Sequence, residues 1–336
     1  MNAGKLLKHV ATTVLFALAV SCAQAQVDYS LYGVADFSYG RFEPSGFEHE
    51  HRWNSNSLSA SFVGVNANYA FDGGWKPGIT LETFLRFEEF EIGRNEDDPF
   101  FSRNAFFSLG SPYGELRIGR QQTLLFDTTT RFNALGNSPT FSPAIRQIFV
   151  SGDLEGVQGD FYWDRSVGYI SPNWEGVTAN VMYSQGPGDR RGDLWGANVV
   201  FSRGLFAAAL SAQRVNVNDG ISDPIDERTW QLGATYNFGW ARLFGLYTRT
   251  DDNGLDVRSN LYSAGASVPV GPGTLLFQAG LGRTEGPAVD RKHTSVSAAY
   301  LYAFNSVTDF YIVGMNDRIR GQTEGVSVAI GARYRF

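Results

Sequence analysis

The last twelve residues of the chain alternate between apolar side chains and polar or small ones. The apolar positions are Val326, Val328, Ile330, Ala332, Tyr334 and Phe336. Successive side chains of a β-strand point to opposite faces, so a period of two places this set on one face and the intervening residues on the other. The pattern predicts a strand with one apolar and one polar face.

Similar alternation recurs in sixteen segments that are separated by turn-forming residues. These predicted strands span residues 27–42, 55–71, 75–91, 101–110, 114–122, 161–171, 176–185, 193–202, 205–216, 227–238, 240–250, 257–269, 273–284, 293–304, 307–317 and 325–336. Many strands with regularly spaced turn signals are typical of a sandwich or a barrel. We therefore expect an all-β fold with 16 antiparallel strands.

The connections between these segments alternate between two lengths. Tight turns occur at 72–74, 111–114, 172–175, 202–204, 238–239, 270–272 and 305–306. Longer, more polar connections occur at 43–54, 92–100, 186–192, 217–226, 251–256, 285–292 and 318–324. Short turns at one end and longer loops at the other are typical of an outer-membrane β-barrel, in which closure satisfies every backbone hydrogen bond within lipid. We predict a 16-stranded transmembrane barrel; a secreted soluble all-β protein is the alternative.

One connection, residues 123–160, has no clear period and is too long for an ordinary loop. Loops of this length in a compact domain are usually functional or disordered. This one contains Phe126, Phe132, Phe141 and Ile148, which makes it too apolar to extend freely into water. We expect it to fold into the barrel interior as a constriction loop; an external flap is the alternative.

The first 25 residues resemble a cleavable secretory signal. Lys5 and Lys8 form a basic start, an apolar stretch follows at 10–20, and Ala23-Gln24-Ala25 fits a cleavage site. The predicted mature barrel is then 26–336. The alternatives are an N-terminal anchor, for which the apolar run is short, and lipidation at Cys22, whose preceding residues fit that signal poorly.

Composition agrees with this interpretation. The chain has 38 Gly and 48 aromatic residues, with 43% apolar residues overall, which argues against intrinsic disorder. Its single cysteine excludes a disulfide-stapled fold. Without the leader, 26 basic residues stand against 34 acidic ones, a net charge of −8 that argues against nucleic-acid binding. The aromatic excess fits girdles at the two membrane interfaces.

The predicted mature chain resembles the trimeric general porins of Gram-negative outer membranes, in the subgroup common in β-proteobacteria. The similar stretches are Leu31-Tyr32-Gly33-Val34-Ala35-Asp36, Asp72-Gly73-Gly74-Trp75-Lys76, Leu81-Glu82, Ser102-Arg103-Asn104-Ala105-Phe106, Gly119-Arg120-Gln121, Phe126-Asp127, Ser166-Val167-Gly168-Tyr169-Ile170-Ser171-Pro172-Asn173 and Tyr334-Arg335-Phe336. The resemblance implies a homotrimer that forms a water-filled channel for passive diffusion of small hydrophilic solutes and ions. It implies no enzymatic activity, no cofactor and no metal.

The resemblance also implies a pore constriction with loop acids facing wall arginines. The residues carried over are Arg103, Glu82, Arg86, Arg117, Asp127, Asn133 and Asn137. Arg117 has a competing interpretation as a solvated arginine low in the wall. Asn133 and Asn137 stand where related loops carry acids, and Ser61-Phe62 and Gly168 stand where arginines are common. We therefore expect a weakened transverse field and mild charge selectivity.

The implied partners are two further copies of the chain in a homotrimer, outer-membrane lipid with lipopolysaccharide, and the barrel-assembly machinery. For the trimer contact the resemblance suggests that Glu96 and Asp97, with Asp98, latch onto a neighbour near Arg120; a solvated acidic loop is the alternative. Tyr334 and Phe336 match the C-terminal signal that the assembly machinery recognises.

Two rival functions remain open from the sequence. A substrate-specific porin for small anions, carboxylates or sugars needs a ladder of charges or an aromatic track, and none is obvious. A barrel enzyme needs a histidine with serine or acidic partners, and His293 with Ser295 or Ser297 is a weak pairing. The His49-x-His51 pair has no identifiable third metal ligand.

Overall fold

The computed structural model describes residues 27–150, 156–158, 160–186, 192–218 and 225–336. The predicted leader, residues 1–25, lies outside the described residues, as do Asp153 and Glu155 of the predicted constriction loop.

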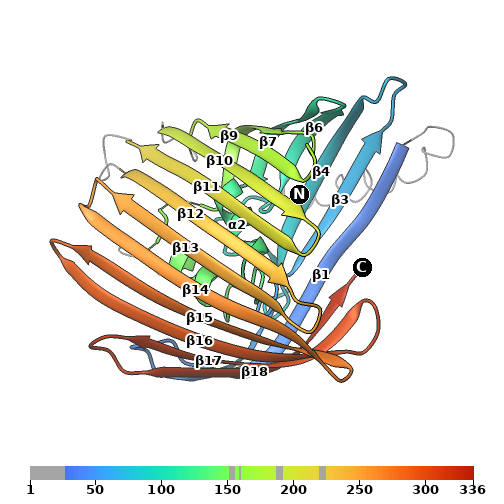
Figure 1. The fold of residues 1–336 in the computed structure, drawn as a ribbon. Coiled ribbons are helices and arrows are strands. Elements are labelled where there is room, and N and C mark those ends of the chain that lie inside the picture. The colour runs from blue at the N-terminus through green and yellow to red at the C-terminus, as the bar shows by residue number, and fades with distance from the viewer. Residues whose placement is uncertain (1–26, 151–155, 159, 187–191, 219–224) are drawn as a thin grey trace, which may run out of the picture.

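The described chain is a closed antiparallel β-barrel (Figure 1). Its strands are β1 (Val27–Phe42), β2 (Glu50–Asn54), β3 (Phe62–Tyr69), β4 (Lys76–Arg86), β5 (Glu91–Ile92), β6 (Ala105–Ser111), β7 (Gly114–Gln122), β8 (Tyr162–Ile170), β9 (Val177–Ser184), β10 (Gly192–Arg203), β11 (Phe206–Val217), β12 (Ile225–Asn237), β13 (Arg242–Asp252), β14 (Val257–Val270), β15 (Gly273–Gly286), β16 (Val289–Ala303), β17 (Thr308–Ile319) and β18 (Gly325–Arg335). The short strands β2 and β5 only extend hairpins on β1 and β4. The other sixteen form the wall, which confirms the predicted fold.

The barrel closes where β18 pairs with β1, from Val34 opposite Arg335 to Arg41 opposite Val328. The last residue continues this ladder, because Phe336 and Gly33 exchange two backbone hydrogen bonds of 3.0 and 3.2 Å. A side chain at position 33 would lie 2.7 Å from the Phe336 ring and 2.4 Å from the Phe62 carbonyl. Because Gly33 has no side chain, the Phe336 ring can pack against β1 at the point where the first and last strands of the barrel meet.

Alternation sorts the side chains as the sequence predicts. On β11, Leu210 faces outward and is 51% exposed, whereas its neighbour Ser211 faces inward and is completely buried. Wall strands thus present apolar residues to the outside and polar ones to the interior. Among the described residues, no helix is both long enough and apolar enough to cross a membrane.

Several sequence-based boundaries were wrong, and two of them change which residues form the wall. Residues 55–61 were expected to begin the second strand, but β3 begins at Phe62 and the preceding residues turn into the barrel, where their polar groups find partners. The connection at 285–292 was expected to be a loop, but β15 and β16 continue pairing as far as Gly286 opposite Val289. The hairpin therefore extends the wall beyond the predicted ends of these two strands.

The described part of the 123–160 connection folds into the barrel interior (Figure 1). It contains helix α2 (Leu124–Arg131), one turn of helix α3 (Pro143–Ile145) and the π-helical turn η1 (Arg146–Val150). Helix α2 contacts β9 to β12, and α3 contacts β14 to β16. The expected in-folded loop is confirmed, and the opposite inner wall, formed by β1, β3, β4, β6 and β7, faces it.

Candidate functional site

The in-folded loop packs against the inner wall at positions that are occupied by glycine. Phe132 is fully buried against this wall, and a Cβ atom at Gly233 would lie 2.7 Å from its ring. A Cβ atom at Gly280 would likewise lie 2.9 Å from Pro143. These inward glycines make room for the loop, because any larger side chain would push it toward the lumen.

Hydrogen bonds from the wall fix the loop along its length. On β12, Gln231 donates to the Thr129 hydroxyl at 2.8 Å, and on β16 Ser297 donates to the Phe141 carbonyl at 2.7 Å. Gln147 donates to Ser295 at 2.9 Å. Buried polar groups that are paired in this way specify one position for the loop, since each broken pair would leave an unsatisfied group.

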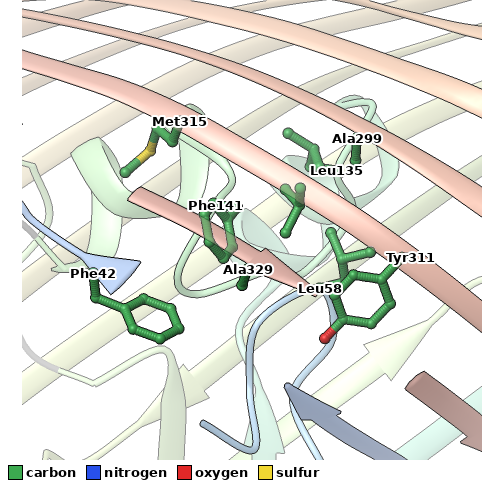
Figure 2. Packing of buried hydrophobic residues seen from close by; sticks show 9 residues of the cluster. Phe42, Leu58, Leu135, Phe141, Ala299, Tyr311, Met315 and Ala329 are labelled. Atoms are coloured by element: carbon green, nitrogen blue, oxygen red, sulfur yellow. The ribbon is translucent and has the colours of Figure 1, made fainter. Parts of the chain in front are cut away.

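The tip of the loop reaches across the lumen to the strands that close the barrel. Leu135 and Phe141 pack against Tyr311 and Met315 of β17 and against Leu58, which lies in the turn before β3 (Figure 2). All five side chains are at most 5% exposed. The loop thus crosses from the end of β7 to the β17–β18 region and divides the interior.

Helix α2 presents two charges to the lumen. Thr123 caps the helix by accepting a hydrogen bond from the Phe126 amide at 3.2 Å. Leu124 and Thr128 are buried against the wall, while Asp127 and Arg131 are exposed one turn apart on the free face. The loop therefore carries a cation beside its acid, because residues four apart on a helix are neighbours.

Glu82 and Arg103 meet on the wall opposite the loop. Glu82 accepts hydrogen bonds from Arg103, from the Tyr32 hydroxyl at 2.6 Å and from the Asn104 amide at 2.6 Å. The Arg103 guanidinium also stacks on the Phe62 ring at 3.9 Å. Two residues predicted to act as separate charges are thus one ion pair, so neither presents an unbalanced charge.

The two other predicted arginines differ in accessibility. Arg86 is tied into the β4–β5 hairpin by Glu89 and by Glu91 at 2.7 Å, and its side chain is only 14% exposed. Arg117 points inward from β7, as alternation predicts, pairs with Glu115 at 2.8 Å and is 34% exposed. The positive charge of Arg117 acts, with that of Arg131, on the Asp127 carboxylate. Arg117 and α2 therefore share one part of the lumen.

The two loop asparagines have different surroundings. Asn133 is buried; it donates to the carbonyls of Thr129 and Gly136 at 2.6 and 2.8 Å and accepts from the Leu135 amide at 3.0 Å. These bonds close the turn that follows α2, so Asn133 shapes the loop from within. Asn137 is partly exposed just beyond this turn.

A β-bulge decides the direction of Arg120. Strict alternation from Arg117 would turn Arg120 toward the outside, but the β7–β8 register shifts between Gly119 and Gln121, and a bulge re-aims side chains. Arg120 is 7% exposed and donates to Asp160 and Asp164 of its own chain, both at 2.9 Å. The expected meeting of Arg120 with a neighbouring subunit does not fit this inward pose.

Asp160 joins the base of the constriction loop to the loop between β4 and β6. Arg94 of that loop donates to both oxygens of Asp160 at 2.8 Å and to those of Asp98 at 2.7 and 2.8 Å. Burial alone would raise the pKa values of both carboxyls. The guanidiniums of Arg94 and, at Asp160, of Arg120 outweigh burial and hold the two pKa values below their usual range.

His293 lies in a buried network that holds the loop. Its Nε2 is 2.7 Å from Asp317 and 3.3 Å from Ser295, and Ser295 also donates to Asp317 at 2.9 Å. A hydrolytic triad needs the two ring nitrogens to face different partners. Here the same nitrogen, Nε2, faces both Asp317 and Ser295. In addition, Arg146 of the loop pairs with Asp317, and Gln147 of the loop donates to Ser295.

Sequence reasoning missed Arg131, Arg94 and Asp36. Arg131 had a usable signal, because it stands four residues after Asp127 in a segment that an N-capping Thr123 could start as a helix. Arg94 had none, since its partner Asp160 is 66 residues away. Asp36 was included only as part of the Leu31–Asp36 similarity.

Comparison with known proteins agrees with this architecture. A family model described as Gram-negative porin matches residues 11–322. Outer membrane porin protein 32 of Delftia acidovorans is 29% identical over 317 residues, covering 88% of this chain and 87% of that protein. An outer membrane porin protein of Bordetella pertussis is 22% identical over 395 residues, covering 98% of this chain and 100% of the relative.

Solved structures share the fold. The anion-selective porin from Comamonas acidovorans superimposes with a TM-score of 0.77 at 22% identity, over 92% of this chain and 100% of that one. The trimer form of OmpT from Vibrio cholerae gives a TM-score of 0.71 at 17% identity, over 92% and 99% of the two chains. With a family model that spans most of its length and a barrel closed around an in-folded loop, the chain belongs to the Gram-negative porin family and is an outer-membrane porin.

Proposed function

We propose that the lumen conducts small hydrophilic solutes and ions by passive diffusion, with only mild charge selectivity. The observation that carries this proposal is the balance of charges around the constriction. Three inward cations each have an acid beside them: Arg103 has Glu82, Arg117 has Glu115, and Arg131 has Asp127. Paired opposite charges largely cancel at a distance, so a passing ion meets only a weak field.

The reversal potential of the purified protein in a planar bilayer, under a potassium chloride gradient, tests this proposal. We expect a small reversal potential and stepwise conductance without saturation. A reversal potential close to the Nernst limit for either ion would contradict balanced charge. Absence of conductance steps in protein that is correctly folded would contradict diffusion itself.

A substrate-specific channel for small anions is the second candidate. It is favoured by one observation, that Arg117 and Arg131 both act on Asp127 and so lie in the same part of the lumen. Two arginines that approach one carboxylate could also approach a carboxylate or phosphate solute. Block of the single-channel current by millimolar acetate, phosphate or glucose, each compared with chloride, separates this candidate from general diffusion.

We propose a homotrimer in which the loop between β4 and β6 contacts a neighbour. Asp98 is held by Arg94 within its own chain, whereas Glu96 and Asp97 remain exposed. Phe90, at the tip of the β4–β5 hairpin, is 94% exposed. Cross-linking in detergent gives the subunit number, and replacing Glu96 and Asp97 with Gln and Asn is expected to lower the trimer melting temperature. An unchanged trimer melting temperature would contradict a contact of Glu96 and Asp97 with the neighbouring subunit.

Export and assembly also stand as proposals. N-terminal sequencing of the protein recovered from outer membranes is expected to begin at Gln26, after cleavage behind Ala25. Tyr334 on β18 and Phe336, which directly follows that strand, have exposed fractions of 48% and 44%, so both are accessible to an assembly factor before the barrel closes. Replacing Phe336 with Ser is expected to reduce the amount of folded barrel in cells, whereas refolding from urea into detergent changes less.

We propose that cations on the outside of the barrel bind the phosphates of outer-leaflet lipid such as lipopolysaccharide. Arg228, Lys292 and Arg318 are exposed on the lipid-facing side near the loop ends of β12, β16 and β17. Trp230 lies two residues below Arg228 on the same face and is 54% exposed. Aromatic residues at headgroup depth, next to cations, are typical of contact with anionic lipid.

A further inference from the structure

Residues 55–61, between β2 and β3, form a turn inside the barrel, hereafter the inner turn. Its serines at 55, 57 and 61 are completely buried, and Leu58 is 3% exposed. A buried segment without regular structure must find partners for its backbone groups other than water. The partners found show what holds the inner turn in place.

A single carboxylate on β1 holds the inner turn. Asp36 is completely buried and accepts hydrogen bonds from three consecutive amides, those of Ser57 at 3.2 Å, Leu58 at 3.3 Å and Ser59 at 3.0 Å. The Tyr311 hydroxyl donates a fourth at 2.7 Å. Hydrogen bonds to an ionised acceptor are roughly twice as strong as neutral ones. The Asp36 carboxylate therefore fixes the position of the inner turn relative to β1.

The other side of the inner turn supports the tip of the constriction loop. The Thr140 hydroxyl donates to the Asn56 carbonyl at 2.9 Å, and the Ser138 hydroxyl donates to the Ser57 carbonyl. Leu58 packs beside Leu135 and Phe141 of the loop (Figure 2). The inner turn thus directs the amides of residues 57–59 toward Asp36 and the carbonyls of residues 56 and 57 toward the loop tip.

We propose that Asp36 is a positioning residue for the pore, which sets how far the constriction loop reaches across the lumen by holding the inner turn against the loop tip. The carboxylate touches no permeating solute and acts only through the inner turn. In Asp36→Asn, one oxygen becomes an amide donor that faces amide and hydroxyl donors, so the inner turn loosens. The loop tip then loses its support. The inference rests on the in-folded loop being the narrowest part of the channel.

Single-channel recordings compare the wild type, Asp36→Asn and the control Asp226→Asn, which alters a partly exposed carboxylate on the outer rim. Folding is checked for each by heat-modifiable migration in detergent gels. We expect Asp36→Asn to give larger and noisier conductance steps, beyond the spread between wild-type insertions, and the control to match the wild type. Wild-type steps in a folded Asp36→Asn barrel would overturn the proposal. Absence of steps in the wild type would instead contradict the channel proposal.

A second variant covers the case in which Asp36→Asn does not fold. Ser138→Ala with Thr140→Val removes the two hydroxyls that join the loop tip to the inner turn and leaves Asp36 untouched. We expect this double variant to reproduce the larger, noisier steps. Wild-type steps in the folded double variant would show that the inner turn does not support the loop tip, and the proposal would be wrong.

Discussion

The guanidinium of Arg103 is bound to the carboxylate of Glu82 and stacked on Phe62, on the wall that faces the constriction loop. The resemblance implied loop acids facing wall arginines, and the departures of this sequence from that pattern predicted a weakened field between them. The structure instead places an acid and an arginine side by side on the wall, and Asp127 beside Arg131 on α2. In these two described pairs each charge has an opposite charge beside it, and this is the basis of the proposed weak field across the lumen.

Removing Glu82 should leave the positive charge of Arg103 without a compensating acid. In Glu82→Gln the Arg103 charge loses its partner, so we expect the channel to become more anion-selective. In 0.1 M salt, one unpaired charge about 8 Å from a permeating ion contributes about 0.25 kcal/mol, with opposite signs for anions and cations, or about a two-fold change in the anion-to-cation permeability ratio. Reversal potentials measure this ratio. Glu82→Gln with Arg103→Gln should return to the wild-type ratio, and a persistent shift in the double variant would contradict the pairing.

The two charges on α2 should have opposite effects. Arg131→Gln leaves Asp127 uncompensated and is expected to favour cations, whereas Asp127→Asn leaves Arg131 and is expected to favour anions. Each shift should again be about two-fold and should shrink as salt rises from 0.1 to 1 M, because screening shortens from about 10 to 3 Å. A shift of the same sign in both variants would show that the helix face is not in the permeation path.

Gly119→Ala is expected to disturb assembly of the barrel. Gly119 has a φ of +139°, and a Cβ atom there would lie 2.2 Å from the Ala105 carbonyl. Strain of this kind costs on the order of 1–3 kcal/mol, and the contact adds to it. The bulge that turns Arg120 inward would also be lost. Heat-modifiable gel migration measures the yield of folded barrel, and Gly204→Ala, at a turn with open space, is the matched control.

Acid should release the tether between the loop after β4 and the base of the constriction loop. The folded-state pKa values of Asp98 and Asp160 are lowered, so the stabilisation is fully present above the unfolded value of about 3.9 and is lost as pH falls through the lowered values. We expect steady conductance from pH 7 to about 4.5 and rising open-channel noise below that. Arg94→Gln removes the tether and should be noisy at pH 7 as well. Equal noise in both proteins at every pH would contradict the tether.

If the outward cations at the loop end of the barrel bind lipid phosphates, stabilisation by lipid A should depend on these cations and not on cations at the turn end. Replacing Arg228, Lys292 and Arg318 with Ser should remove the rise in melting temperature that added lipid A causes in detergent. The control replaces Lys76, Arg203 and Arg242, which are exposed at the opposite rim, and should keep that rise. Loss of the effect in both triple variants would indicate general charge attraction, and its retention in both would remove the proposed site.

Single residues show where prediction from the pattern succeeds and where it fails. Leu210 and Ser211 could be assigned to faces because alternation is a property of neighbours in the chain. Arg117 was placed inward for the same reason, and the structure agrees. Alternation alone could not place Arg120, because a bulge at Gly119 shifts the alternation by one residue and nothing in the local pattern marks a bulge. Residues 55–61 were assigned to a strand because alternating serines there imitate a strand's polar face.

The order of strands, the two classes of connection and the in-folding of an apolar loop follow from local physics, since a strand that spans lipid must alternate and an apolar loop must be covered. The partners of each charge do not follow from it. Arg94 meets Asp160, Asp36 meets the amides of residues 57–59, and Arg103 meets Glu82 because closing the barrel brings distant segments together. Only this folded arrangement determines which charges cancel and which face a passing ion.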